Sequence, residues 1–432
     1  MFIENFLGGV IILIFLSSII TKTLVIKMLS KKVFHPLSLF VQYRKLSTSP
    51  GVELTTCIRN ANVQICGDLY AKYRESGIKR FNKAPRDGIS VNAEFFDNRL
   101  IVGEGNGTVL MLPGAPGHFS HFTSLIGELN SLGVRVVAPN FPGECNTQFS
   151  LLHIFIELQL VGENVSHETK LFRHTPEERT EYIKAILQEA DITSHIDMVV
   201  SHSSGSFIST YLKKDPRAPV IKSVALLNPV GAEPSRPMNP QLFFKIMMPL
   251  WHYDAGRYVL ITLGENILRL LNHPFKDAPL LEGAVGLLSS IYVNWSDMQK
   301  AFDHLAQSDI PKLVMMSDND GVMGRKLNAN LIRTLGLDYE DDAMLFNDQC
   351  QMMVNRPRVR NNTTFIRLRR GGHFSFIKHA NVINPQIVEL LQKAMKMNVE
   401  SVREQNDAIS SRKPTFNNYS FYENASWTAI AN

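Results

Sequence analysis

The chain has 432 residues, of which 44% are hydrophobic and 20% are charged, a composition typical of a globular protein with a substantial core. Its net charge of +5 lies entirely within residues 1–52, which hold six basic residues and one acidic residue. The rest of the chain has no basic stripe with interleaved aromatic residues, so a nucleic-acid partner is excluded. Four scattered cysteines without a C-x-x-C pair exclude a disulfide framework and a structural zinc or redox site.

The most hydrophobic run of the chain is Phe6–Leu29. Its length is close to that of a membrane span, and basic residues follow it while almost none precede it. The sequence therefore predicts an anchor over residues 6–29, with the body of the chain in the cytosol. Two alternatives stay open for residues 1–52. From Met28 the chain is basic, acid-free and serine-containing, like a mitochondrial presequence, and a cleaved secretory signal is the other.

Short apolar strands alternate with helices from residue 89 onward. Strands, in several cases with the turn that follows, are expected at 89–100, 107–117, 134–143, 195–204, 223–231, 311–320 and 363–373. Helices are expected at 118–133, at 205–213, at 384–397, and at 176–189, where Thr175 is the expected N-cap. This alternation predicts an α/β fold with a mostly parallel sheet and helices on both faces.

The body is assigned to residues 53–398. Between about residues 231 and 308 the alternation gives way to apolar, helical stretches, which we interpret as a helical cap over an apolar pocket. Additional core helices are the alternative for this segment. Residues 399–432 are polar and rich in Asn and Ser, which predicts a disordered tail.

Ser203 lies between an expected strand and an expected helix, in "SHSSG". A nucleophile elbow needs small residues two positions either side of the nucleophile, because the turn brings those positions close to the following helix. Ser201 and Gly205 occupy them, so Ser201 stands where glycine is usual. His202, His118 and His121 are expected nearby as pocket-wall or surface residues rather than as a second base.

A serine nucleophile needs a base, an acid that orients the base, and amides that stabilise an oxyanion. His373 follows a strand on a Gly-Gly turn, and Asp318 and Asp320 end another strand. The chain order Ser, Asp, His is that of α/β-hydrolases. The candidate oxyanion donors are the backbone amides of Ala115 and Ser204.

With these motifs, residues 89–398 resemble an α/β-hydrolase of the serine-hydrolase type. "LPGAPG" resembles the oxyanion loop of that family, "SHSSG" its elbow and "GGHF" its catalytic histidine loop. The family's Gly-x-x-Asp turn aligns with Ser317 and Asp320, so Asp320 is preferred to Asp318 as the acid. Pro113, Asn140 and Ser201 depart from the family pattern. The chain is also similar to a nematode-expanded branch of this family with no assigned function.

The resemblance implies a serine hydrolase that cleaves a carboxylic ester or thioester through an acyl-enzyme and needs neither a cofactor nor a metal. The apolar cap and the anchor together favour an apolar or lipid-like acyl substrate. Two alternatives remain: a catalytically silent binding protein with the same fold, and acyl transfer by the same three residues.

Overall fold

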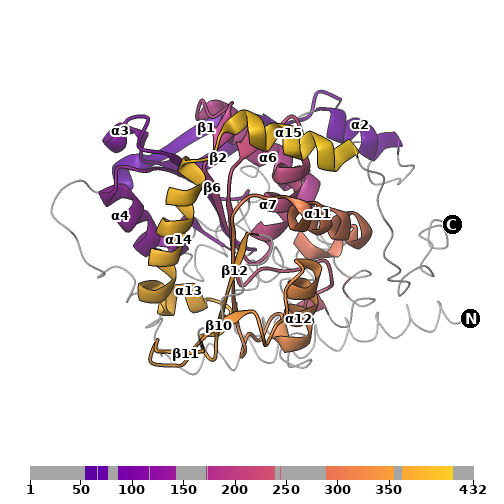
Figure 1. Ribbon diagram of the computed structural model, residues 1–432. Coiled ribbons are helices and arrows are strands. Elements are labelled where there is room, and N and C mark those ends of the chain that lie inside the picture. Colours follow the sequence, from indigo (N-terminus) through magenta and orange to yellow (C-terminus); the bar gives the residue numbers. More distant parts are fainter. Residues whose placement is uncertain are drawn as a thin grey trace, which may run out of the picture. The chain divides into compact units, whose positions relative to one another are not determined.

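A ten-stranded sheet forms the centre of the computed structural model (Figure 1). The structure describes residues 54–65, 67–75, 86–115, 117–142, 172, 174–238, 244, 289–354 and 362–411. All of them belong to one of the two units into which the chain divides, Leu54–Asn432. Across the sheet the strands run in the order β1 (Ile58–Ile65), β2 (Ile89–Asp97), β4 (Arg135–Pro139), β3 (Thr108–Leu112), β6 (Met198–His202), β8 (Val224–Leu227), β9 (Lys312–Ser317), β12 (Thr363–Leu368), β10 (Ala343–Phe346) and β11 (Met352–Val354).

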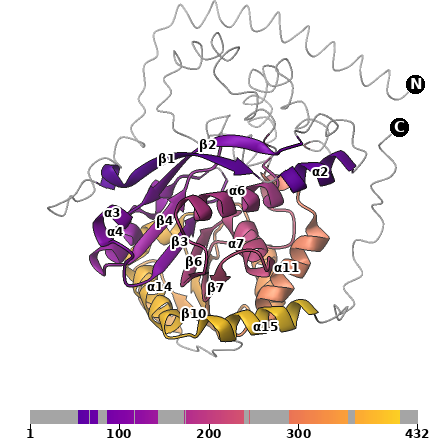
Figure 2. The same ribbon diagram turned by 90° about the horizontal axis from the view of Figure 1, so that it is seen from above.

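All strands from β4 to β10 in this order are parallel to one another. Only the two edges are antiparallel. At one edge β1 and β2 form a long ribbon that joins β4 (Figure 2), and at the other β11 pairs with β10. A separate two-stranded parallel sheet joins β5 (His195–Ile196) to β7 (Val220–Ile221). The mostly parallel sheet predicted from the sequence is therefore confirmed.

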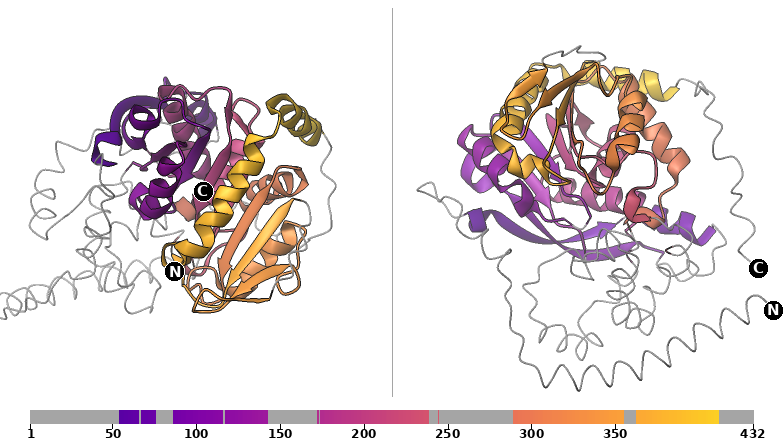
Figure 3. Two further views of the ribbon diagram at one scale, coloured as in Figure 1. Left: turned by 60° about the vertical axis from the view of Figure 1, so that its left-hand side comes forward. Right: turned by 90° about the horizontal axis from the view of Figure 1, so that it is seen from below.

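Helices cover both faces of the sheet, and each face has its own apolar cluster. One cluster includes side chains of α6 (Pro176–Glu189), α7 (Gly205–Lys214), α11 (Trp295–Gln307), α12 (Gly324–Thr334) and α15 (Val399–Ser411). The other includes side chains of α4 (Thr123–Ser131), α13 (Ser375–Lys378) and α14 (Ala380–Met395), and Figure 3 shows α14, in yellow, beside the orange strands. Within the described ranges the structure also has the helices η2 (Leu54–Cys57), α2 (Gly67–Glu75), α3 (Arg99–Val102), η4 (Phe119–Phe122) and η5 (Arg236–Met238).

Burial on both faces explains why the central strands are apolar throughout instead of alternating with polar residues. In β3, Val109 and Met111 join one cluster while Leu110 joins the other. Helix α6 begins as predicted, because the Thr175 hydroxyl accepts a hydrogen bond of 3.1 Å from the Glu178 amide and Pro176 is the first helical residue.

The structure differs from the sequence predictions at several elements. Strand β2 pairs with β4 and with the upstream strand β1, which was not predicted, and the end of the strand expected at 89–100 belongs to helix α3. The strands β10 and β11 were not predicted. Residues 399–411, predicted as part of a disordered tail, form helix α15, and the reason is that Val402 is buried in the core cluster.

The predicted cap and anchor lie mainly outside the described residues. Of the cap segment, the structure describes 231–238, 244 and 289–308. Here α11 packs on α7 and buries Met298, Phe302 and Leu305 in the core, so this end of the segment is a sheet-covering helix and not cap. No helix among the described residues has the length and apolarity to cross a bilayer. Residues 6–29 lie outside that set.

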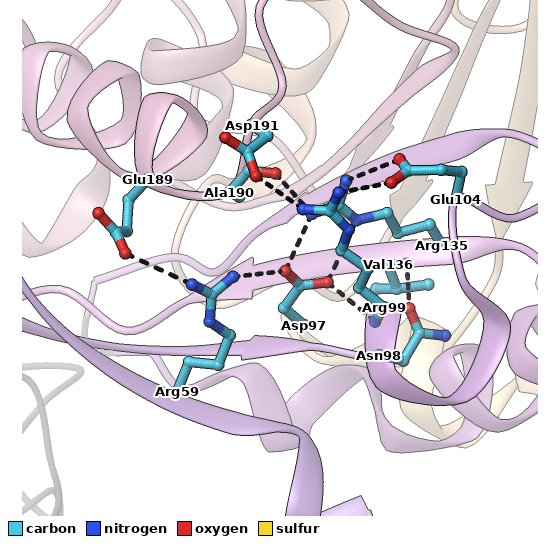
Figure 4. Close-up of polar contacts among 10 residues, drawn as sticks. All are labelled: Arg59, Asp97, Asn98, Arg99, Glu104, Arg135, Val136, Glu189, Ala190 and Asp191. Atoms are coloured by element: carbon cyan, nitrogen blue, oxygen red, sulfur yellow. Dashed lines mark hydrogen bonds and ion pairs between the residues drawn. The ribbon is translucent and has the colours of Figure 1, made fainter.

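A buried ion network ties the antiparallel edge of the sheet to β4 (Figure 4). Both oxygens of the Asp97 carboxylate, which is fully buried, accept hydrogen bonds from Arg135, at 3.0 and 3.2 Å. Arg59 and the Arg99 amide donate to the same carboxylate at 3.1 and 3.0 Å. Arg135 also donates to the Ala190 carbonyl at the end of α6, so one carboxylate organises β1, β2, β4 and α6.

We expect Asp97→Ala to lower the free energy of unfolding by about 3–5 kcal/mol, because it removes the buried counterion of Arg135 and leaves that buried guanidinium only the exposed carboxylate of Glu104, 3.6 Å away. Urea unfolding measures this loss. The control is Glu389→Ala, which removes an exposed ion pair with Lys393 and is expected to cost about 0.5 kcal/mol or less. Equal losses for the two variants would contradict the assigned role of Asp97.

Candidate active site

Ser203 occupies the sharp turn between β6 and α7, with a φ of +52°. This left-handed conformation is costly for any residue other than glycine, so surrounding contacts must hold it. The Ser203 amide donates to the Leu227 carbonyl at 3.1 Å, and the Ser203 carbonyl accepts from the amides of Ser206 and Val230, both at 3.1 Å. The end of β8 thus fixes the turn and projects the Ser203 side chain beyond the carboxyl edge of the sheet.

Small residues surround this turn because the backbone of β3 passes very close to it. A Cβ on Gly205 would lie 2.5 Å from the Leu112 carbonyl oxygen, and one on Gly114 would lie 2.7 Å from the Cβ of Ser203. Ser201, where the family pattern has glycine, is fully buried, and its hydroxyl lies 3.3 Å from that of Ser209 on α7. The Ser201 side chain therefore fits beside α7 and the turn still forms.

His373 joins the serine to a carboxylate. Its Nε2 lies 2.8 Å from Ser203 Oγ, and its Nδ1 lies 2.8 Å from Asp320 Oδ2. Because a carboxylate only accepts, Nδ1 carries the proton of the neutral ring and Nε2 accepts from the serine hydroxyl. The structure thus brings together Ser203, His373 and Asp320 in the order that proton transfer from a serine requires.

The Asp320 carboxylate is fully buried but well supplied with donors. The amides of Val322 and Met323 donate to Oδ1 at 2.8 and 3.1 Å, and the Asn228 side chain donates to Oδ2 at 3.1 Å. Burial raises the pKa of Asp320, but the charge and hydrogen bond of His373, with the two amides, outweigh this and hold the pKa below its ordinary value. Asp320 is therefore ionised at neutral pH.

Asp318 has a different set of partners. Its Oδ1 accepts from Arg367 Nε at 2.7 Å and from the Tyr339 hydroxyl at 2.9 Å, and Arg367 also pairs with Glu340. The side chain thus takes part in an ion network under β12. Of the two acids that the sequence offers, the structure brings Asp320 to His373.

The two candidate oxyanion donors belong to segments that adjoin Ser203. Ala115 follows the close approach of Gly114 to the serine, and Ser204 is the N-cap residue of α7. Neither amide donates a hydrogen bond to any residue within the described ranges. Within those ranges, no group of three histidine, cysteine or acidic side chains could hold a metal ion.

Two amide side chains that the sequence analysis missed support the histidine loop. Asn319 Oδ1 accepts from the amides of Gly371 and Gly372 at 3.0 and 2.9 Å. Asn228, with a φ of +43°, accepts from the Ser375 hydroxyl at 2.5 Å while its Nδ2 binds Asp320. The one available sequence signal was the position of both asparagines just beyond the ends of strands, at the edge where the candidate triad lies.

Of the three histidines expected nearby, His202 and His121 contact the histidine loop, whereas His118 stacks on Phe119 and bonds Ser120. His202 is buried beside His373, and His121 contacts the ring of Phe374 edge-on at 5.2 Å between centroids. Burial lowers the pKa of His121 to about 4, and it also lowers the pKa of His118. These two histidines are therefore mainly neutral at neutral pH. Phe374, the residue after His373, keeps 40% of its surface exposed.

A family model described as "Alpha/beta hydrolase of unknown function (DUF1057)" matches residues 76–323, more than half of the chain. The chain belongs to this family of alpha/beta hydrolases. A search of curated proteins finds no match to the sequence of this hydrolase.

Solved structures of related fold include esterases and a lactonase. A thermophilic esterase from Thermogutta terrifontis aligns with a TM-score of 0.47 and 14% identity, covering 78% of this hydrolase and 100% of the esterase. An esterase from Exiguobacterium antarcticum aligns with a TM-score of 0.43 and 11% identity, covering 72% of this chain and 98% of the esterase. An enol-lactonase from Burkholderia xenovorans LB400 aligns with a TM-score of 0.43 and 13% identity, covering 69% of this chain and 97% of the lactonase.

We expect Gly205→Ala to lower the free energy of unfolding of this hydrolase by at least about 2–3 kcal/mol, because the new methyl group meets the Leu112 carbonyl and the backbone must move. Gly127→Ala is the matched control, since nothing lies within 4 Å of a Cβ there and helix α4 gains about 0.5–1 kcal/mol. Thermal and urea unfolding compare the stabilities of the two variants. An unchanged stability for Gly205→Ala would contradict the close approach of β3 to this turn.

Proposed function

We propose that this protein is a serine hydrolase that cleaves a carboxylic ester or thioester by way of an acyl-enzyme. The observation that supports this most strongly is the unbroken chain of contacts from Ser203 Oγ through His373 to Asp320, at 2.8 Å each. The strained, left-handed turn at Ser203 and its position between a parallel strand and a helix add to it.

In the proposed mechanism Ser203 Oγ attacks the carbonyl carbon of the substrate while His373 Nε2 takes the hydroxyl proton. The resulting imidazolium is stabilised by the ionised Asp320. The amides of Ala115 and Ser204 would donate to the oxyanion of the tetrahedral intermediate. His373 then gives its proton to the leaving alcohol or thiol, and a water molecule, deprotonated by the same ring, releases the acid from Ser203.

The proposed acyl group is apolar or lipid-like. The support comes from Phe374, whose exposed ring stands next to His373 and packs against His121 and His202. The predicted anchor over residues 6–29 and the predicted cap would place such a site near lipid, and both remain predictions from the sequence. No part of the proposed chemistry calls on a cofactor.

A fluorophosphonate probe tests the proposal, because it forms a covalent bond only with an activated serine. We expect the wild-type protein to label and Ser203→Ala to lose all labelling while its melting temperature changes little. If the wild type does not label, the protein is better described as a silent binding protein with this fold. If Ser203→Ala labels as strongly as the wild type, another serine reacts with the probe and the assignment of Ser203 as the nucleophile fails. Product analysis with added alcohols distinguishes hydrolysis from acyl transfer.

We expect Asp320→Asn to slow labelling by about 10³-fold or more, because the histidine loses the carboxylate that orients it and stabilises its charge. Asp318→Asn is the matched control: it weakens an ion pair with Arg367, so we expect lower thermal stability but a labelling rate within about threefold of wild type. The rates are compared at neutral pH on folded protein. The reverse ranking would assign the acid to Asp318.

A further inference from the structure

His202, the residue before the nucleophile, contacts the backbone of the histidine loop. Its ring is 1% exposed, and its Nε2 lies 3.0 Å from the carbonyl oxygen of His373. Because a carbonyl only accepts, Nε2 carries the ring proton and donates it to this bond. Among the described residues no other side chain forms a hydrogen bond with the backbone of His373.

This hydrogen bond is the second contact between the nucleophile turn and His373, in addition to the contact between Ser203 Oγ and His373 Nε2. Ser203 binds the side chain of His373, and His202 binds the backbone carbonyl of the same residue. The two donors are neighbours in the chain, so the distance between them is set by one peptide unit. The turn at Ser203 thereby fixes both the backbone position of His373 and the direction of its imidazole ring. Asn319 and Asn228 hold the preceding glycines and the acid, but neither makes such a contact with His373 itself.

Packing alone does not account for a histidine at position 202. The ring lies among His373, Phe374 and Phe376, with centroids 4.7–4.9 Å away. Its other nitrogen, Nδ1, is buried and has no hydrogen-bond partner among the described residues, and a Cβ on Gly114 would lie 3.2 Å from it. An unsatisfied buried acceptor costs about 1–3 kcal/mol. A phenylalanine would fill the space without that cost, so the Nε2–H donor is what histidine adds.

The donor is also available at every pH at which the site would work. Burial, and next the charge of His373, hold the pKa of His202 well below its ordinary value. The ring therefore stays neutral with its single proton on Nε2. His202 is thus unsuited to be a second base, because its only free lone pair faces Gly114 and not the hydroxyl of Ser203.

We propose that His202 is a positioning residue for the candidate triad: its Nε2–H holds the carbonyl of His373 and keeps that imidazole aligned with Ser203 Oγ. This inference rests on the proposed function, since it concerns the alignment of a general base. It adds a contact between the nucleophile turn and the histidine loop that operates independently of Asp320.

Two substitutions separate the hydrogen bond from the packing. His202→Phe keeps a ring and removes the donor, whereas His202→Gln loses the ring and keeps an amide N–H at nearly the position of Nε2. With a short activated ester we expect His202→Phe to lower kcat by about 10–100-fold with KM changed less than about threefold, because a misplaced base costs rate and not binding. We expect His202→Gln to recover kcat to within about fivefold of wild type. Rates of fluorophosphonate labelling should follow the same order.

The matched control is His304→Phe, the same change at a buried histidine of α11 that bonds Ser410 and has no contact with the site. We expect it to label at the wild-type rate. Melting temperatures verify that each variant is folded. If His202→Phe does not fold, His202→Asn replaces it, because the shorter amide cannot reach the His373 carbonyl and should lose rate where His202→Gln does not.

The outcomes distinguish the two proposals. A wild type that neither labels nor cleaves the ester overturns the proposed function. An active wild type with an equally active His202→Phe overturns the positioning role of His202. Equal losses of rate in folded His202→Phe and His202→Gln also overturn it, because the effect would then follow the ring and not the donor.

Discussion

The close approach of β3 to the turn at Ser203 is the constraint on which the site depends. The carbonyl groups of Leu112 and Pro113 leave no space for a side chain at Gly205, and the hydrogen bonds from Ser203 to Leu227 and Val230 hold the φ of Ser203 at +52°. A wider turn would relieve the strain but would withdraw the hydroxyl from the carboxyl edge of the sheet. The two positions that flank the nucleophile differ in the space around them. Ser201 has room for its side chain beside α7, whereas Gly205 has none beside β3.

The parallel sheet explains why residues so far apart in the sequence meet at this turn. Ser203, Asn228, Asp320 and His373 each follow a strand, and parallel strands end at the same edge. Strand ends alone set positions only coarsely, whereas proton transfer needs contacts of about 3 Å. Side-chain hydrogen bonds between neighbouring loops supply the remaining alignment: Asn228 to the acid, Asn319 to the Gly-Gly turn and His202 to the histidine itself.

Two fully buried carboxylates lie where loops or edge strands must be held in one arrangement. Asp97 binds Arg59 and Arg135 at the antiparallel edge, and Asp320 binds amides and His373 at the candidate site. Each carboxylate is fully buried and takes several donors, which offsets the cost of removing the charge from water. The apolar clusters on the two faces of the sheet provide the burial, and these carboxylates set the register of the elements that they join.

The sequence by itself determined the alternating strands and helices, Ser203 in a strand-turn-helix, and the chain order of Ser, Asp and His. These signals are local: apolar runs, glycine turns and the Thr175 cap lie within a few residues of what they specify. The family resemblance preferred Asp320 as the acid, but only the tertiary structure shows its contact with His373 and what holds Asp318 elsewhere. Asp318 and Asp320 share one turn, and the distant Arg367 and Tyr339 engage the former. The same holds for α15, whose polar sequence is ordered by the burial of Val402, and for His202, since packing between distant segments leaves no local pattern.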